Sequence, residues 1–283
     1  MEARQLAFPD LVWSHFSRPR FGDFDERVAA AASAGMAGIG LYVFEYARLR
    51  EEEGRSAADI RAVLDGHGLV LADAEVIRGW WATEGEPRHE SQRIEALAWE
   101  MADEFGIRYL QAIGPYECSL EQAAEGFGEL CDRAAAYGVL VGIEPLPYTN
   151  IASAPDAQAI VAAAGRANGG YCVDIWHHTR GPNGLDEITA LEPERIFAIQ
   201  MNDGTLQPAL DDYKTDCLAH RMPPGQGEFD CVGFVRALVQ MGVTAPISLE
   251  VCSTELWNQP ADVAARAAAD GMRDVLREAG VPA

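Results

Sequence analysis

Eight short apolar runs alternate with longer amphipathic stretches along this chain, and no other feature constrains the fold as much. The runs are LAFPDLVW (6–13), GIGLYVF (38–44), LVLADAEVI (69–77), IRYLQAI (107–113), VLVGIEPL (139–146), GYCVDI (170–175), RIFAIQMND (195–203) and APISLEV (245–251). Each run has the length of a buried strand. Strands that are separated by helices pair in parallel, so the pattern predicts a parallel sheet.

The stretches between the runs carry helix start and stop signals. We expect helices over 24–34, 56–67, 87–105, 119–137, 155–165, 184–191, 228–240 and 260–278. Ser56 and Ser119 are suited to cap two of these helices at the N-terminus, and Gly106 and Gly242 to end two others. Eight strand–helix units of about 35 residues predict a single (β/α)₈ TIM barrel over residues 1–283. A doubly wound open sheet is the alternative, but the first turn, 14–22, lacks its GxGxxG pattern.

The composition excludes several kinds of partner. The chain has 44 acidic and 22 basic residues, a formal net charge of −22, whereas binding to nucleic acid or to an anionic membrane surface needs a basic face. No run approaches the length of a membrane span, and the start, MEARQLAFPD, does not read as a secretory signal. Six cysteines without a CxxC pair indicate reduced thiols. We therefore expect a cytoplasmic protein with a small-molecule substrate, no nucleic-acid partner and no membrane association.

Four of the expected strands end in oxygen-donor side chains. They are Glu144, Asp174, Gln200 and Glu250, on the fifth to eighth strands. Active sites of TIM barrels lie at this carboxyl end, and three carboxylates that face one point stay ionised together only around a cation. Oxygen donors suit Mg²⁺ or Mn²⁺, so we expect one such ion as the cofactor. The alternative is that each acid caps the helix that follows it.

These residues and their spacing resemble the sugar phosphate isomerase/epimerase superfamily of xylose-isomerase-like TIM barrels. That group includes ketose 3-epimerases, hydroxypyruvate isomerase, inosose dehydratase, 3-dehydroshikimate dehydratase and endonuclease IV. The resemblance covers nearly the whole chain and is strongest over 139–251. It implies the same four metal ligands, and it marks two substrate-binding residues: His177, in a D-x-x-H motif, and Arg221, in the segment HRMPPGQGEFD (220–230). It also implies pairing into a homo-oligomer.

The chain departs from the superfamily pattern at two positions. The strand-7 ligand is most often His, whereas Gln200 stands here, which favours Mg²⁺ or Mn²⁺ over Zn²⁺ and argues against the endonuclease IV branch. Some dehydroshikimate dehydratases carry a His two residues after the strand-5 Glu, where this chain has Leu146.

The ligand set predicts chemistry on the carbon next to a carbonyl group. A divalent ion that chelates a carbonyl and a neighbouring hydroxyl stabilises the enediolate formed when the α-proton leaves. Glu144 and Glu250 are the candidate bases. We expect an isomerase or epimerase acting on a ketose or keto-polyol. The alternative is a dehydratase or lyase that performs β-elimination on a cyclic keto-polyol, keto-glycoside or dehydroshikimate-like substrate, because both reactions share the first step.

Aromatic and polar side chains near the strand ends complete the expected site. Trp176 and Tyr42 are predicted to shape the substrate pocket, since ligand pockets are mostly apolar. Glu75 and Gln111 are candidates to bind sugar hydroxyls. The loop 204–227, inserted after the seventh strand, is long enough to act as a lid.

Overall fold

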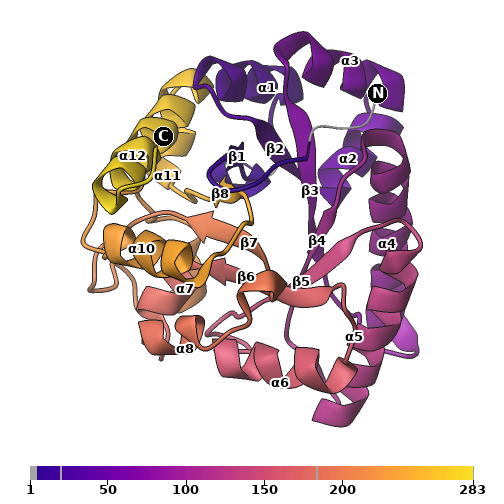
Figure 1. The fold of residues 1–283 in the computed structure, drawn as a ribbon. Coiled ribbons are helices and arrows are strands. Elements are labelled where there is room, and N and C mark those ends of the chain that lie inside the picture. The colour runs from indigo at the N-terminus through magenta and orange to yellow at the C-terminus, as the bar shows by residue number, and fades with distance from the viewer. Residues whose placement is uncertain (1–4, 20, 183, 283) are drawn as a thin grey trace.

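Eight parallel strands close into one barrel in chain order, which confirms the predicted TIM barrel (Figure 1). The computed structural model describes residues 5–19, 21–182 and 184–282. The first four residues of the sequence, part of the segment considered above as a signal, lie outside them. The strands are β1 (Leu11–Trp13), β2 (Gly38–Tyr42), β3 (Val70–Ile77), β4 (Tyr109–Ile113), β5 (Leu140–Glu144), β6 (Gly169–Asp174), β7 (Ile196–Met201) and β8 (Ile247–Leu249).

Helices surround the barrel on the outside (Figure 1). They are α1 (Phe24–Ser33), α2 (Val43–Glu51), α3 (Ala57–His67), α4 (Gly85–Phe105), α5 (Leu120–Ala135), α6 (Ala154–Ala164), α7 (Ile175–Arg180), α8 (Leu185–Thr189), α9 (Tyr213–Cys217), α10 (Cys231–Met241), α11 (Thr254–Trp257) and α12 (Ala261–Ala279). Ser56 and Ser119 each form a capping box, and Gly106 and Gly242 end their helices in the left-handed conformation, as predicted. The last helix, α12, packs against α1 and closes the outer ring.

Two helices, α2 and α7, lie where the sequence pattern predicted no helix. The run 38–44 was expected to be extended throughout, but α2 begins at Val43, directly after β2. In the same way α7 begins at Ile175, where the run 170–175 was expected to continue as a strand. Both helices follow their strands without a loop, so apolar residues of the helix continue the apolar run of the strand.

The barrel interior is filled by side chains that alternate along each strand. Gln111, Glu144 and Asp174 point inward at the carboxyl end, and Tyr109 and Cys172 lie two residues deeper. Glycines on the neighbouring strands give the larger interior groups room. This places a polar layer above an interior that is closed by packed side chains.

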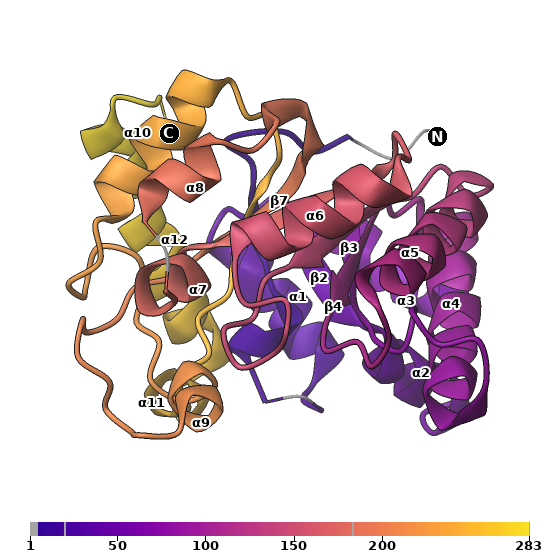
Figure 2. The same ribbon diagram turned by 90° about the horizontal axis from the view of Figure 1, so that it is seen from below.

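The inserted loop 204–227 is structured rather than extended. It contains α9, and two short antiparallel bridges join its flanks to the barrel, Asp203 to Met222 and His220 to Ser253. Figure 2 shows α9 beside α11 at one end of the molecule. Arg180 of α7 pairs with the buried Asp216 of α9, which ties the loop to the element that follows β6.

Among the residues that the structure describes, none of the helices combines the length and apolar character that crossing a bilayer requires.

Candidate active site

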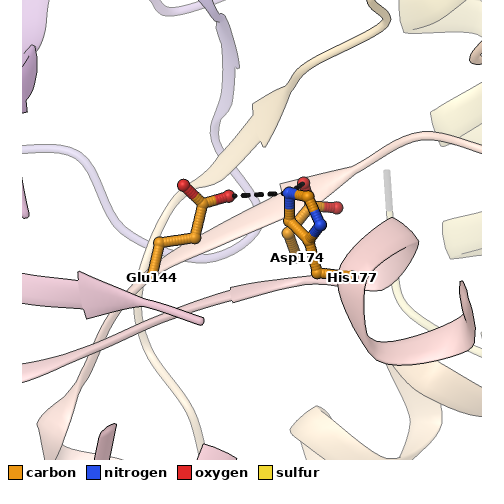
Figure 3. Close-up of side chains that lie close together, drawn as sticks. All are labelled: Glu144, Asp174 and His177. Carbon is orange, nitrogen blue, oxygen red and sulfur yellow. Dashed lines mark ion pairs between the residues drawn. The ribbon is translucent and has the colours of Figure 1, made fainter. Parts of the chain in front are cut away.

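Glu144, Asp174 and His177 face one another at the carboxyl end of the barrel (Figure 3). Glu144 ends β5, Asp174 ends β6, and His177 lies on the first turn of α7, three residues after Asp174 and therefore on the same side of the chain. His177 Nε2 lies 3.4 Å from Glu144 Oε1 and 3.6 Å from Asp174 Oδ2. One ligand atom from each of the three residues falls within 4.8 Å of the others, close enough to contact one ion.

Arg221 joins the fourth predicted strand-end residue to this group. Its Nη1 donates to Asp174 Oδ2 at 2.8 Å and to Glu250 Oε2 at 2.9 Å. The guanidinium is held from behind by Cys217, which accepts from Nε through its carbonyl at 3.0 Å and from Nη2 through Sγ at 3.1 Å. A single cationic nitrogen therefore bonds to carboxylates from β6 and from the end of β8.

Gln200 of β7 lies in the same layer, between Gln111 and Glu250. Its Nε2 donates to Gln111 Oε1 at 3.2 Å and to Glu250 Oε1 at 3.1 Å. Its Oε1 accepts from Cys172 Sγ at 3.3 Å. The amide nitrogen thus faces Glu250 in this arrangement, and ligation through the oxygen requires the amide group to turn over.

Gln111 contacts a carboxylate of the site and Glu75 contacts the Ser14 hydroxyl, whereas the sequence suggested both as contacts for sugar hydroxyls. Gln111 Nε2 donates to Glu144 Oε2 at 2.5 Å. The Ser14 hydroxyl lies 3.3 Å from Glu75 Oε2 and 3.3 Å from Glu250 Oε1. These contacts hold one oxygen of each catalytic candidate, Glu144 and Glu250, in a fixed direction.

Burial and neighbouring charges shift the pKa values of Glu250 and Asp174 in opposite directions. Burial raises the pKa of Glu250 well above its usual range, and the nearby Glu144 and Asp174 add to this rise while Arg221 opposes it. Burial also acts to raise the pKa of Asp174, but Arg221 and His177 outweigh it, so that the pKa of Asp174 is lowered. Hydrogen bonds from the backbone N–H of Trp176 and from Asn202 act in the same direction. Asp174 therefore stays charged, and Glu250 is the acid that takes up a proton more readily.

Several residues of the site were not identified from the sequence. Tyr213 of α9 places its Oη 2.9 Å from His177 Nδ1, and the two rings stack 6.0 Å apart. Asn202 donates to Asp174 Oδ1 at 2.9 Å, and Cys217 holds Arg221. Tyr213 and Cys217 both lie in the inserted loop, so the predicted lid was the one signal that pointed to them.

Trp176 and Tyr42 are both buried beside the site. The Trp176 ring packs against Phe229. The guanidinium groups of Arg180 and Arg221 lie over the ring, 4.8 and 5.5 Å from its centroid. Tyr42 packs against His15 on the β1 side of the rim. Trp176 thus supports two arginines, and the substrate-shaping role of both aromatic residues stays a prediction.

The donor set fits a hard divalent cation. Glu144, Asp174 and His177 bring ligand atoms close enough to contact one ion, and Arg221 joins the buried Glu250 to Asp174. The guanidinium nitrogen between Asp174 and Glu250 stands in for a positive ion. Gln200, which donates to Glu250, offers an amide oxygen if its amide group turns over. The arrangement can therefore neutralise a cation, bind oxygen atoms of a substrate and exchange protons with it.

Two curated proteins are similar to this chain in sequence. The chain is 27% identical over 266 residues to the 3-dehydroshikimate dehydratase of Pseudomonas aeruginosa, a match that covers 90% of this chain and 40% of that protein. It is 28% identical over 153 residues to the inosose isomerase of Bacillus subtilis, covering 52% of each chain. The chain thus spans two fifths to about half of these curated relatives.

Two solved structures share the fold. One is the IolI protein with a bound zinc atom, with a TM-score of 0.82, 19% identity, and coverage of 95% of this chain and 98% of that one. The other is the D-allulose 3-epimerase of Methylomonas sp. in complex with D-allulose, with a TM-score of 0.71, 19% identity, and coverage of 96% and 99%. The profile of the family described as "Xylose isomerase-like TIM barrel" matches residues 28–277. The chain belongs to this xylose isomerase-like TIM barrel family, as the resemblance predicted.

Proposed function

We propose that this protein is a divalent-metal-dependent isomerase or epimerase that moves the proton next to the carbonyl of a ketose or keto-polyol. One observation carries the proposal: two buried acids, Glu144 at the end of β5 and Glu250 directly after β8, are linked through Asp174. His177 lies beside Glu144 and Asp174, and Arg221 bonds to Asp174 and Glu250. A base on each side of a substrate is what removal and return of a carbon-bound proton needs. The inosose isomerase and epimerase relatives support this reading.

Glu144, Asp174, Gln200 and Glu250 would hold the ion, which we propose to be Mn²⁺ or Mg²⁺ because all four ligands donate through oxygen. When bound, the ion supplies Lewis-acid stabilisation of negative charge on the substrate oxygens. The zinc atom in the IolI structure supports a divalent ion in this fold, without selecting the metal.

The chain's own residues divide the remaining work. A carboxylate has two oxygens, so Glu144 and Glu250 can each bind through one and take a proton on the other. Glu250 is buried and its carboxylate is held by Ser14, Gln200 and Arg221, which suits a group that must take up a proton and return it at a fixed position. His177, held by Tyr213, is placed to contact a substrate oxygen. We propose that the loop 204–227, which carries Tyr213 and Arg221, covers the substrate and excludes water.

A dehydratase or lyase is the second candidate, and one comparison favours it. The dehydratase of Pseudomonas aeruginosa matches 90% of this chain, a longer match than the one to the inosose isomerase. The same bases would then remove the α-proton, and a hydroxyl or another leaving group in the β position would depart from a cyclic keto-polyol, keto-glycoside or dehydroshikimate-like substrate.

Exchange of hydrogen in deuterated water distinguishes the two reactions. The enzyme, loaded with Mn²⁺ for activity assays and with diamagnetic Mg²⁺ for NMR, is incubated with inososes, keto-sugars and 3-dehydroshikimate. Loss of the α-proton signal with retention of every hydroxyl, and a new epimer or aldose, supports the isomerase. A new enone or aromatic signal supports the lyase. Neither exchange nor product in any substrate class contradicts both.

The composition of the chain bears on where the reaction takes place. We propose a cytoplasmic enzyme with a small carbohydrate-like substrate, supported by the acidic charge and by six cysteines that are free thiols. Its pairing into a homo-oligomer stays a prediction from the resemblance.

A further inference from the structure

We propose that Arg221 is an internal counter-cation that competes with the divalent ion for Asp174 and Glu250, so that the inserted loop 204–227 sets the affinity of the metal site. The inference deepens the proposed function and rests on its metal site. It differs from the role that the resemblance implies, in which Arg221 contacts the substrate alone.

The contacts of Arg221 carry the inference. Nη1 bonds to Oδ2 of Asp174 and to Oε2 of Glu250, which are oxygens of two proposed metal ligands. It also lies 3.2 Å from the Glu250 carbonyl oxygen. Both carboxylates and the arginine are at most 5% exposed, so water does little to screen these charges. A metal ion that binds the two carboxylates would therefore contact the same oxygens to which the guanidinium is bonded.

Contacts on several sides fix the position of the Arg221 guanidinium. Cys217 binds it through both its carbonyl and its thiol, and the Trp176 ring lies beneath it. The backbone N–H of Arg221 donates to the Cys252 carbonyl at 3.0 Å, which joins the loop to the residues after β8. Further along the loop, the pair between Asp216 and Arg180 anchors α9. Movement of the loop therefore moves the positive charge.

Two consequences follow for the energetics of the site. A divalent ion must displace Nη1 from the oxygens or share them with it, and the repulsion between the two cations lowers the ion's affinity. Without any ion, the guanidinium neutralises two buried acids that would otherwise repel each other. Removing its charge should therefore tighten metal binding and weaken the protein that has been stripped of metal.

The test compares Arg221→Met with wild type. Methionine keeps much of the apolar stem and removes the charge. After treatment with EDTA and its removal, Mn²⁺ is titrated by isothermal calorimetry and by electron paramagnetic resonance of the free ion. We expect a Kd lower by about tenfold or more for the variant. In EDTA we expect the variant to melt at a lower temperature than wild type, and to gain more in melting temperature when Mn²⁺ is added.

Arg133→Met is the matched control. Arg133 is an arginine of α5 whose partner is Glu95, so it lies outside the inserted loop and bonds to no proposed ligand. We expect its Mn²⁺ affinity to stay within about twofold of wild type, because Asp174 and Glu250 keep their counter-cation. If Arg221→Met does not fold without metal, Arg221→Gln replaces it, because glutamine also removes the charge but can still donate a hydrogen bond to the carboxylates, and we expect a gain in affinity in the same direction.

The outcomes separate this inference from the proposed function. Tighter Mn²⁺ binding by the Arg221 variant alone supports the inference. Equal affinities of wild type and Arg221→Met, or an equal gain in Arg133→Met, overturn it while leaving the metal-dependent reaction in place. Absence of Mn²⁺ binding in every protein overturns both the inference and the proposed metal site.

Discussion

Three side chains of the site bond to the Glu250 carboxylate. Gln200 and the Ser14 hydroxyl lie at its Oε1, and Arg221 bonds to its Oε2. It follows β8 directly, so its backbone is held by the barrel: its N–H donates to the carbonyl of Met201 on β7. A side chain fixed at both oxygens and at the backbone is well suited to deliver a proton to one position.

Replacing Glu250 by Gln tests its role as a base. The amide keeps the shape and removes the ability to take a proton, so we expect kcat to fall by at least about a hundredfold in either candidate reaction. Glu255→Gln removes an exposed carboxylate of α11 from the same region and serves as the control. Turnover by Glu250→Gln within a few-fold of wild type would remove the assigned role.

Asp73, in the barrel interior, gives a prediction about pH and stability. Burial raises its pKa from 3.8 to about 6, against the opposing charge of Arg27. The folded protein therefore binds more protons than the unfolded chain between about pH 4 and 6, so this group's contribution to stability falls as the pH rises through that window. The measurement is the free energy of unfolding in urea. We expect the difference between Asp73→Asn and wild type to shift in favour of the variant by about 1–3 kcal/mol from pH 4 to pH 7.5.

The exposed Asp132 should change stability with pH in the opposite direction. A hydrogen bond from Arg166 lowers the pKa of Asp132, so its contribution is present above the unfolded pKa and is lost on acidification. Asp132→Asn should therefore lose, rather than gain, stability at pH 7.5 relative to pH 4. A pH-independent difference between Asp73→Asn and wild type would contradict the raised pKa of Asp73.

At the scale of the elements, periodicity predicts most of the fold. The apolar runs contain seven of the strands, because a strand buried on both faces must be apolar along its length, and β6 begins one residue before its run. The same pattern fails at α2 and α7, where the helix starts directly after the strand and its first apolar residues continue the pattern of the strand. His177 shows the consequence. On an extended chain, residues three apart point to opposite faces, whereas the helical start of α7 brings His177 to Asp174.

Close packing of the barrel interior predicts the effect of a substitution in β2. A Cβ at Gly40 would lie inside van der Waals contact of Asp73 Oδ1 and Glu75 Oε1, so we expect Gly40→Ala to cost about 1–3 kcal/mol in urea unfolding. Gly66, within α3, has no atom within 4 Å of the corresponding position. Gly66→Ala should therefore stabilise the protein by up to about 1 kcal/mol through helix propensity. Similar values for both variants would contradict this packing.

The anchor of α9 gives a prediction for the inserted loop. Asp216 is buried and accepts from Arg180 and from the backbone N–H groups of Ala209 and Leu210. Asp216→Asn weakens this set, so hydrogen exchange over 204–227 should accelerate about tenfold or more while the barrel strands stay protected. Asp212→Asn, which keeps the capping side chain of α9, is the control. Unchanged exchange in Asp216→Asn would show that the loop is held by other contacts.

At the scale of the whole molecule, closure of the barrel assembles the site. Ser14 and Glu250 are 236 residues apart in the sequence and lie 3.3 Å apart because β1 pairs with β8. The order of the strands predicted acids at one end of the barrel, and Glu144 and Asp174 meet there with His177. The set of four metal ligands stays a prediction.

The order of the strands did not predict that Arg221 would bond to two of the acids, or that Tyr213 and Cys217 would contact His177 and Arg221. The path of a 24-residue inserted loop (residues 204–227) follows from its tertiary contacts rather than from any repeating pattern.

The central claim is that oxygen donors from the last four strands of the barrel hold one divalent cation. The most direct test is a crystal structure of the protein with Mn²⁺, with anomalous data that locate the metal. The account predicts one strong anomalous peak within coordination distance of Glu144, Asp174, Gln200 and Glu250. A structure at saturating Mn²⁺ with no peak among these side chains, or with the ion held elsewhere, would contradict it.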